Sequence, residues 1–140
     1  MNIFSKNPER CSYILDLLVN KGAQVNKKNF DNWAPIHTAV RKGQESAIKA
    51  IGRFEPQEHA RKAPQQQFDL DLGGGSQQWT ALHLAALSSQ PKILVDLAQA
   101  GANIFQRNLQ NQLPRHCARG NFITTKIIKQ IEQRQLRNSF

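Results

Sequence analysis

The sequence has few of the residues that build disulfide-linked, metal-binding or membrane-spanning proteins. Its two cysteines, Cys11 and Cys117, lie far apart and form no Cys-x-x-Cys pair, so neither a zinc site nor a disulfide framework is expected. The longest apolar runs, such as YILDLLV and ALHLAAL, fall far short of the roughly 18 consecutive apolar residues of a spanning helix. The opening segment MNIFSKNPER lacks the apolar stretch of a secretory signal. These absences predict a soluble, intracellular and cytoplasmic protein.

Acidic residues are also scarce, at 10 against 19 lysines and arginines, which gives a formal net charge of +9. Such a surface attracts nucleic acid, acidic lipid or acidic protein, and charge alone does not choose among them. From Leu97 onward Glu132 is the single acid. The basic residues of that stretch are Arg107, Arg115, Arg119, Lys126, Lys129, Arg134 and Arg137.

One segment of the chain recurs. WAPIHTAVRKG is repeated as WTALHLAALSS and, more faintly, as QLPRHCARG, each with one histidine. His83 and His116 are 33 residues apart, whereas His37 and His83 are 46 apart, which corresponds to the same period plus 13 inserted residues. A second pattern, ILDLLVNKGAQVN, matches ILVDLAQAGANIF and alternates with the first. The two patterns together define one repeated unit.

These motifs resemble the ankyrin repeat family, whose 33-residue unit is a β-turn followed by two antiparallel helices with a Thr-Pro-Leu-His-x-Ala-Ala signature. The resemblance extends from about Arg10 to Gln133. It implies an all-α ankyrin-repeat solenoid of stacked helix-turn-helix units with β-turn fingers. About three to four units are expected, including a partial first one and a degenerate last one. A chain of 140 residues is long enough for one such domain.

The resemblance also places the units along the chain. It predicts a partial repeat at 1–26, a repeat at 27–70 with an insertion at about 55–67, a repeat at 71–103, a C-terminal capping repeat at 104–136 and a tail at 137–140. Helices are expected at about 8–20, 35–42, 44–54, 81–88, 91–100, 114–119 and 123–136. The glycines of GGGS, Gly73 to Ser76, are not followed by Gly-Lys-Ser/Thr, so we expect a lengthened turn rather than a phosphate-binding loop.

The recurring histidine has two possible roles, catalytic and structural. In the family the motif histidine bonds backbone groups of its own turn and of the neighbouring repeat, which satisfies polar atoms that are costly to bury. Translated copies along a stack cannot converge on one substrate, so His37, His83 and His116 are expected to be structural. His59 falls in the insertion and is expected to be a solvated loop residue. We therefore predict no enzyme, no catalytic residue, no metal and no cofactor.

The partner-binding residues are inferred from the family's variable contact positions, which flank the histidine motif and line the concave surface. They are Phe30, Asp31, Trp33, Arg41, Lys42, Ser76, Gln77, Trp79, Leu87, Ser88, Leu109, Gln110, Gln112 and Arg119. Tryptophan and arginine dominate interface energetics. The alternative that Trp33 and Trp79 only pack over neighbouring turns is left open.

The function predicted from these features is that of a non-enzymatic scaffold or adaptor that binds an acidic protein surface. The 16 glutamines and the incomplete first unit favour a small subunit of a larger intracellular assembly, for which a cytoskeletal or ciliary complex is one candidate. Two alternatives remain: binding of nucleic acid or another polyanion through the basic C-terminal end, and a regulatory module of a larger enzyme. The nucleic-acid alternative predicts a steep loss of affinity with salt.

Overall fold

The computed structural model describes residues 25–53, 68–118 and 120–138. The predicted helix at about 8–20, the insertion at about 55–67 with His59, and Arg119 lie outside the described residues. Within the described part the chain forms helices and turns with a single isolated β-bridge. The helices are α2 (Pro35–Arg41), α3 (Glu45–Arg53), α4 (Ala81–Leu87), α5 (Pro91–Gln99), α6 (Pro114–Cys117) and α7 (Phe122–Asn138).

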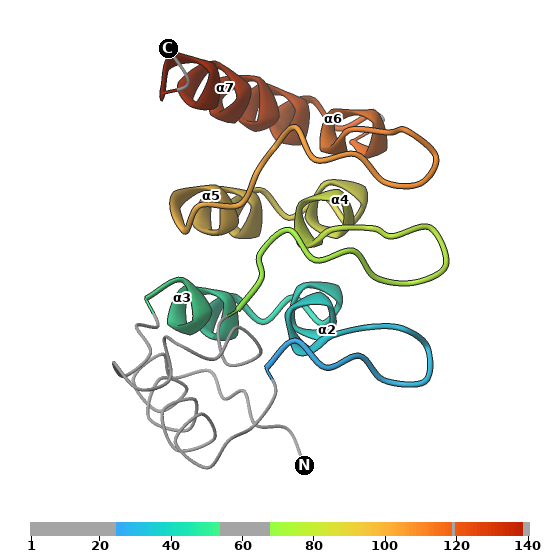
Figure 1. Cartoon of the computed structure of the whole chain (residues 1–140). Helices are drawn as coiled ribbons and strands as arrows, with labels where there is room; N and C mark the ends of the chain where they lie inside the picture. Colours follow the sequence, from blue (N-terminus) through green and yellow to red (C-terminus); the bar gives the residue numbers. More distant parts are fainter. Residues whose placement is uncertain (1–24, 54–67, 119, 139–140) are drawn as a thin grey trace.

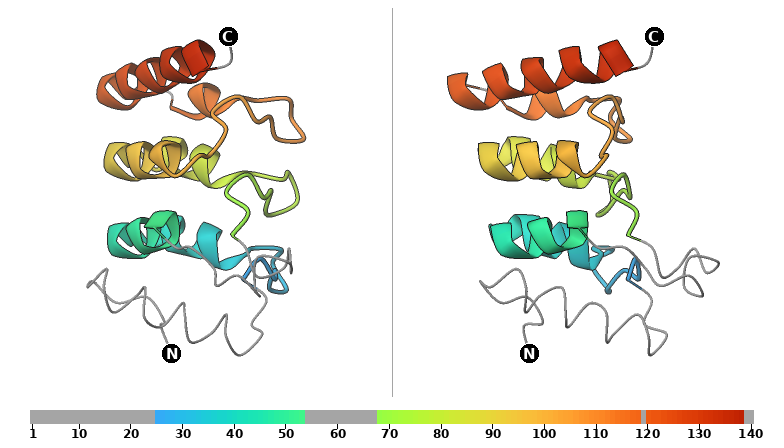
Figure 2. Two further views of the ribbon diagram at one scale, coloured as in Figure 1. Left: turned by 60° about the vertical axis from the view of Figure 1, so that its left-hand side comes forward. Right: turned by 90° about the vertical axis from the view of Figure 1, so that its left-hand side faces the viewer.

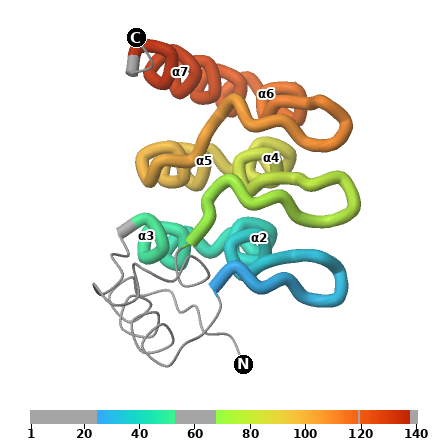
Figure 3. Tube along the Cα trace, in the orientation of Figure 1, coloured from blue at the N-terminus to red at the C-terminus, as the bar shows by residue number. Residues whose placement is uncertain are grey.

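The helices are arranged in stacked antiparallel pairs (Figure 1). The first helices α2, α4 and α6 form one column, and the second helices α3, α5 and α7 form the other; within each column consecutive helices are in contact. Figure 2 shows the same layers from the side. Three loops, which we call fingers, project from the first-helix column (Figure 3). The predicted all-α stack of helix pairs is therefore confirmed. Three to four units were expected, and the described residues form three pairs.

Small residues on the first helices allow the layers to approach closely. Ala39, Ala81 and Ala85 are fully buried, and larger aliphatic side chains fill the space between the two columns. The fully buried aliphatic residues are Ile36, Val40, Ile48, Leu82, Ile93, Leu94, Leu97, Ile104 and Ile128. Burial of each such side chain contributes about 1.5–3 kcal/mol, and most of it occurs only when units stack.

The predicted helix ends agree with the structure to within one residue in the first two pairs and to within two residues in the last pair. Helix α6 was expected to continue to Arg119 but ends at Cys117. The chain then turns through Gly120, whose φ of +77° favours glycine. Asn121 accepts a hydrogen bond from the Thr124 N–H through Oδ1 (2.8 Å), as an N-cap does. Helix α7 consequently begins at Phe122 and runs to Asn138, beyond the predicted Leu136.

Candidate protein-binding surface

Each finger is a tight hairpin closed by backbone hydrogen bonds. Asn29 N–H donates to the Trp33 carbonyl (2.9 Å), and Asn108 N–H donates to the Gln112 carbonyl (3.1 Å). In the middle finger Gly74 and Trp79 exchange two hydrogen bonds of 2.8 Å each. The middle hairpin therefore contains one more residue than its neighbours. This confirms that the GGGS segment lengthens a repeat turn.

Asparagine side chains fix the conformation of the outer two fingers. Asn29 Oδ1 accepts hydrogen bonds from the N–H groups of Asp31 and Trp33, both at 3.0 Å. Asn108 Oδ1 accepts from Gln110 (3.0 Å) and Gln112 (2.9 Å) in the same way. Asn29 and Asn108 were not among the residues predicted from the sequence. The signal in the sequence was an asparagine four positions before Trp33 and before Gln112, since asparagine commonly bonds the backbone two residues on.

Hydrogen bonds also join each finger to the next. Gly75 N–H donates to the Asn32 carbonyl (2.9 Å), while the Asn32 side-chain amide donates to the Gly75 carbonyl (2.8 Å). Leu109 N–H donates to the Gln77 carbonyl (2.8 Å). The three fingers are thereby held at a fixed spacing.

The two buried histidines tie each turn to the following unit. His37 Nδ1 accepts from Ala34 N–H (3.0 Å), and its Nε2 lies 2.7 Å from the Leu72 carbonyl. His83 Nδ1 accepts from Thr80 N–H (3.2 Å), and its Nε2 lies 2.7 Å from the Gln112 carbonyl. Because an N–H group only donates and a carbonyl only accepts, both rings are neutral with the proton on Nε2. These contacts confirm the structural role predicted for His37 and His83.

Burial lowers the pKa of both imidazoles below the ordinary value of 6.5. The main cause is desolvation, which disfavours the charged ring, and the carbonyl contacts to Leu72 and Gln112 oppose it. A second proton would also place a donor on Nδ1 against a backbone N–H. Both effects keep the rings neutral near pH 7.

The expectation for His116 was wrong in part. Its Nδ1 accepts from Leu113 N–H (2.8 Å), as in the other units, but the side chain is exposed. Its Nε2 has no partner within the described part of the chain. The reason is its position, because the described residues place no further unit against α6 and the carbonyl that would accept from Nε2 is missing.

Trp33 stacks between its own unit and the next. Its ring meets His37 edge-on with centroids 5.5 Å apart, and the Arg41 guanidinium lies 4.9 Å from its centroid. A Cβ atom added at Gly74 would come within 2.6 Å of Trp33 Cε3, so the indole packs directly on that glycine. Trp79 repeats the edge-on contact with His83 at 6.0 Å. Trp33 therefore packs over the neighbouring turn and remains partly exposed.

The other predicted contact residues are divided between exposed and structural positions. Phe30 at the first fingertip is fully exposed, Leu109 at the equivalent position of the third is 69% exposed, and Leu87 at the end of α4 is 56% exposed. Asp31, Arg41, Lys42, Ser76, Ser88 and Gln110 are also exposed. Gln77 and Gln112, in contrast, accept the inter-unit hydrogen bonds described above through their carbonyls. Arg119 lies outside the described residues.

The described residues hold no cluster of three or more histidine, cysteine or carboxylate side chains able to hold a metal ion. Among the helices that the structure describes, none is both long and apolar enough to cross a membrane.

The structure consists of stacked helix pairs joined by hairpin fingers, and His37 and His83 each hydrogen-bond the backbone of the following unit. These features define a helical repeat protein. A family model of ankyrin repeats, in three copies, matches residues 3–108. The chain belongs to the ankyrin repeat family, as its motifs indicated. The match ends within the third finger, whereas α6 and α7 continue the stack on α4 and α5. No curated protein matches the chain. Ankyrin repeats generally serve as protein–protein interaction modules, and the family is typically non-catalytic.

Proposed function

We propose that this protein is a non-enzymatic scaffold or adaptor that binds an acidic surface of another protein through its finger face. The finger face is the surface formed by the three fingers and the first helices α2, α4 and α6, which in this family is the concave side. In this proposal the protein is a small subunit of a larger intracellular assembly. The observation that carries the proposal is the exposed apolar residue Phe30, which belongs to the same finger as Trp33, the aromatic partner of Arg41.

Charge supports an acidic partner. Lys27, Arg41 and Lys42 are exposed around the first finger. The neighbouring acids are Asp31 and Asp69, whose N–H donates to Asn26 Oδ1 (2.9 Å). The contact of Arg41 with the Trp33 ring is a cation–π interaction, which contributes about 0.5–1 kcal/mol at an exposed site and restrains the guanidinium. A restrained arginine over an aromatic ring loses little entropy on binding, which is why such residues concentrate binding energy.

The apolar fingertips support a protein rather than a simple polyanion. Phe30 and Leu109 extend beyond the backbone of their hairpins and cover no core. Because both occupy the same position in their fingers, they lie on one face of the stack, two fingers apart. Apolar anchors surrounded by cations match a protein surface with apolar pockets and acidic edges better than a phosphate backbone.

The proposal is tested by affinity purification of the full chain and of matched variants. We expect the protein that co-purifies with the wild type to be lost with Phe30→Ala combined with Arg41→Glu. It should be retained with Lys92→Glu, which makes the same charge change at an exposed site on α5. Trp33 is unsuitable as the first target because its removal would also disturb the packing on Gly74. Equal recovery from all three chains would reject the finger face as the binding surface.

A further inference from the structure

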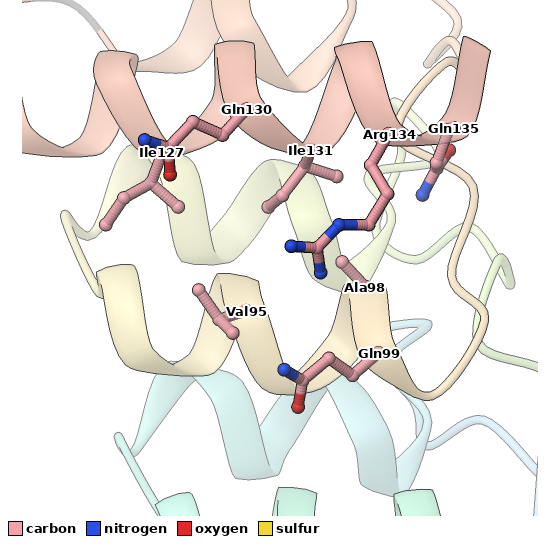
Figure 4. A pocket seen from close by; sticks show the side chains of 8 residues that line it. All are labelled: Val95, Ala98, Gln99, Ile127, Gln130, Ile131, Arg134 and Gln135. Atoms are coloured by element: carbon pink, nitrogen blue, oxygen red, sulfur yellow. The ribbon is translucent and has the colours of Figure 1, made fainter. Parts of the chain in front are cut away.

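A groove lies between the second helices α5 and α7, in the helix column away from the fingers (Figure 4). Its volume is about 450 Å³, within the usual ligand-pocket range of roughly 300–1,000 Å³. Neither the family's contact positions nor the proposed function uses it. The groove is therefore a separate site to explain.

The groove is lined by four apolar side chains at helical spacing and by four polar ones, which are Gln99, Gln130, Arg134 and Gln135. Val95 and Ala98 face it from α5, three positions apart, and Ile127 and Ile131 face it from α7, four positions apart. Residues three or four positions apart lie on one face of a helix. Both walls thus present a short apolar stripe, which is the surface against which a third amphipathic helix packs.

The walls are held in place by the side chain of Gln135. Its Nε2 donates to the Ala102 carbonyl (2.8 Å), and its Oε1 accepts from Ile104 N–H (3.0 Å). These two bonds fix the last turns of α7 to the backbone that follows α5. Because the spacing of the two helices is set before any ligand arrives, the groove is preformed.

The charge around the groove is positive. Arg134 extends from α7 into the space between the helices (Figure 4). Among the described residues, the carboxylate on α7 is Glu132, which pairs with Arg115 of α6 at 3.6 Å. The carboxylate on α5 is Asp96, which lines the neighbouring groove between α3 and α5. Neither carboxylate lines this groove. Arg137, three positions after Arg134 on α7, is also exposed.

We propose that the α5–α7 groove binds an acidic amphipathic helix of a protein partner. Apolar side chains on one face of that helix enter between Val95, Ala98, Ile127 and Ile131, and a flanking Asp or Glu accepts hydrogen bonds from Arg134. A nucleic acid fits less well, because its phosphates would lie against apolar side chains. The site is distinct from the finger face, so the two surfaces allow one chain to bridge two partners.

The test uses a designed probe with the full chain. The probe is a fluorescein-labelled helical peptide of about 14 residues, with leucines at positions i, i+3, i+4 and i+7 and glutamates along both flanks. We expect amide resonances of Val95, Ala98, Ile127 and Ile131 to shift on titration, with affinity measured by fluorescence anisotropy. Two control peptides carry the same residues in scrambled order, or lysines in place of the glutamates, and neither should bind.

Matched variants locate the site. Arg134→Glu should weaken binding at least tenfold, because a charge-assisted hydrogen bond is replaced by repulsion. Ala98→Phe should block the groove while leaving the circular dichroism spectrum helical. Lys129→Glu, with the same charge change, should alter affinity less than twofold, since five residues place its side chain about 140° around α7 from Arg134. Phe30→Ala with Arg41→Glu should also leave peptide binding intact, which separates this site from the finger face.

Several results would overturn the proposal. The first is an absence of binding at millimolar peptide, and the second is resonance shifts confined to the fingers. The third is an equal loss of peptide affinity in Arg134→Glu and Lys129→Glu, because that would indicate a general attraction to anions. Tighter binding of a single-stranded oligonucleotide than of the acidic peptide, with loss in both charge variants, would assign α7 to nucleic acid instead.

Discussion

Trp33 and Gly74, from successive fingers, are in direct contact: a Cβ atom on Gly74 would lie 2.6 Å from Trp33 Cε3 and 2.9 Å from His37 Nδ1. At Gly74 and Gly75 of the GGGS segment, the Trp33 indole occupies the space that a side chain would need. Gly75, which would meet the same ring at 2.9 Å, has a φ of +70° in addition. Trp33 thus explains two of the three glycines.

The first prediction follows from this contact. Gly74→Ala should destabilise the protein by about 1–3 kcal/mol, because neither ring can move without disturbing the stack. Ser76→Ala, an exposed change in the same finger, should stay within about 0.5 kcal/mol of wild type. Urea denaturation followed by circular dichroism measures both, and equal stability of the two variants would show that the fingers are loosely packed.

Stability should depend on pH through His37 and His83. The pKa of each is lowered below 6.5 in the folded state, so the unfolded state binds more protons as pH falls below that value. The two rings therefore make their full contribution to the free energy of unfolding above about pH 6.5. This contribution declines toward lower pH, by at most about 1.4 kcal/mol per pH unit for each ring. Lys28, which also lowers the pKa of His37, and Asp69, which raises it, modify the onset.

Denaturant titrations between pH 8 and pH 5, together with NMR titration of the imidazole resonances, measure this dependence. A free energy of unfolding that is flat below pH 6.5 would contradict the assignment of two neutral buried rings.

Gln135 supplies a third prediction. Gln135→Ala removes the partners of the Ile104 N–H and the Ala102 carbonyl, whose residues are buried, so a loss of about 1–3 kcal/mol is expected. Hydrogen exchange of the Ile104 amide should become faster. Gln133→Ala, at an exposed site on the same helix, should change neither quantity. An unaltered Ile104 exchange rate would mean that the Gln135 contacts do not persist in solution.

The difference between Ala34 and Thr80 indicates a substitution that should stabilise the protein. Both residues precede a first helix, but Thr80 Oγ1 also accepts from His83 N–H (3.4 Å) and lies 2.7 Å from His83 Nδ1. Ala34→Thr places the same hydroxyl beside His37 and should stabilise the protein by about 0.5–1 kcal/mol. Thermal denaturation measures the gain. A lower melting temperature would indicate that buried Ala34 has no room for the larger side chain.

The repeat period indicated a repeated unit, and the resemblance of its motifs to the ankyrin repeat family implied the stacked helix pairs and the structural roles of His37 and His83. The motifs recur at a fixed spacing, which a sequence records directly. The finger contacts were predicted less well, because the position of Trp33 beneath Gly74 depends on how two units stack and not on either unit alone. The α5–α7 groove was missed for the same reason: Ala98 and Ile131 have the pattern of core residues, and only the position of α7 leaves a space between them.

The inter-unit hydrogen bonds of His37 and His83 have the same direction along the chain. His37 depends on Leu72 and His83 depends on Gln112, each in the unit that follows. With respect to these contacts, loss of a later unit leaves an imidazole of the preceding one without its acceptor, whereas loss of an earlier unit frees a loop carbonyl that water can satisfy. The histidine bonds consequently give the array a polarity. We expect unfolding of a unit to destabilise the unit on its amino-terminal side more than the unit on its carboxyl-terminal side.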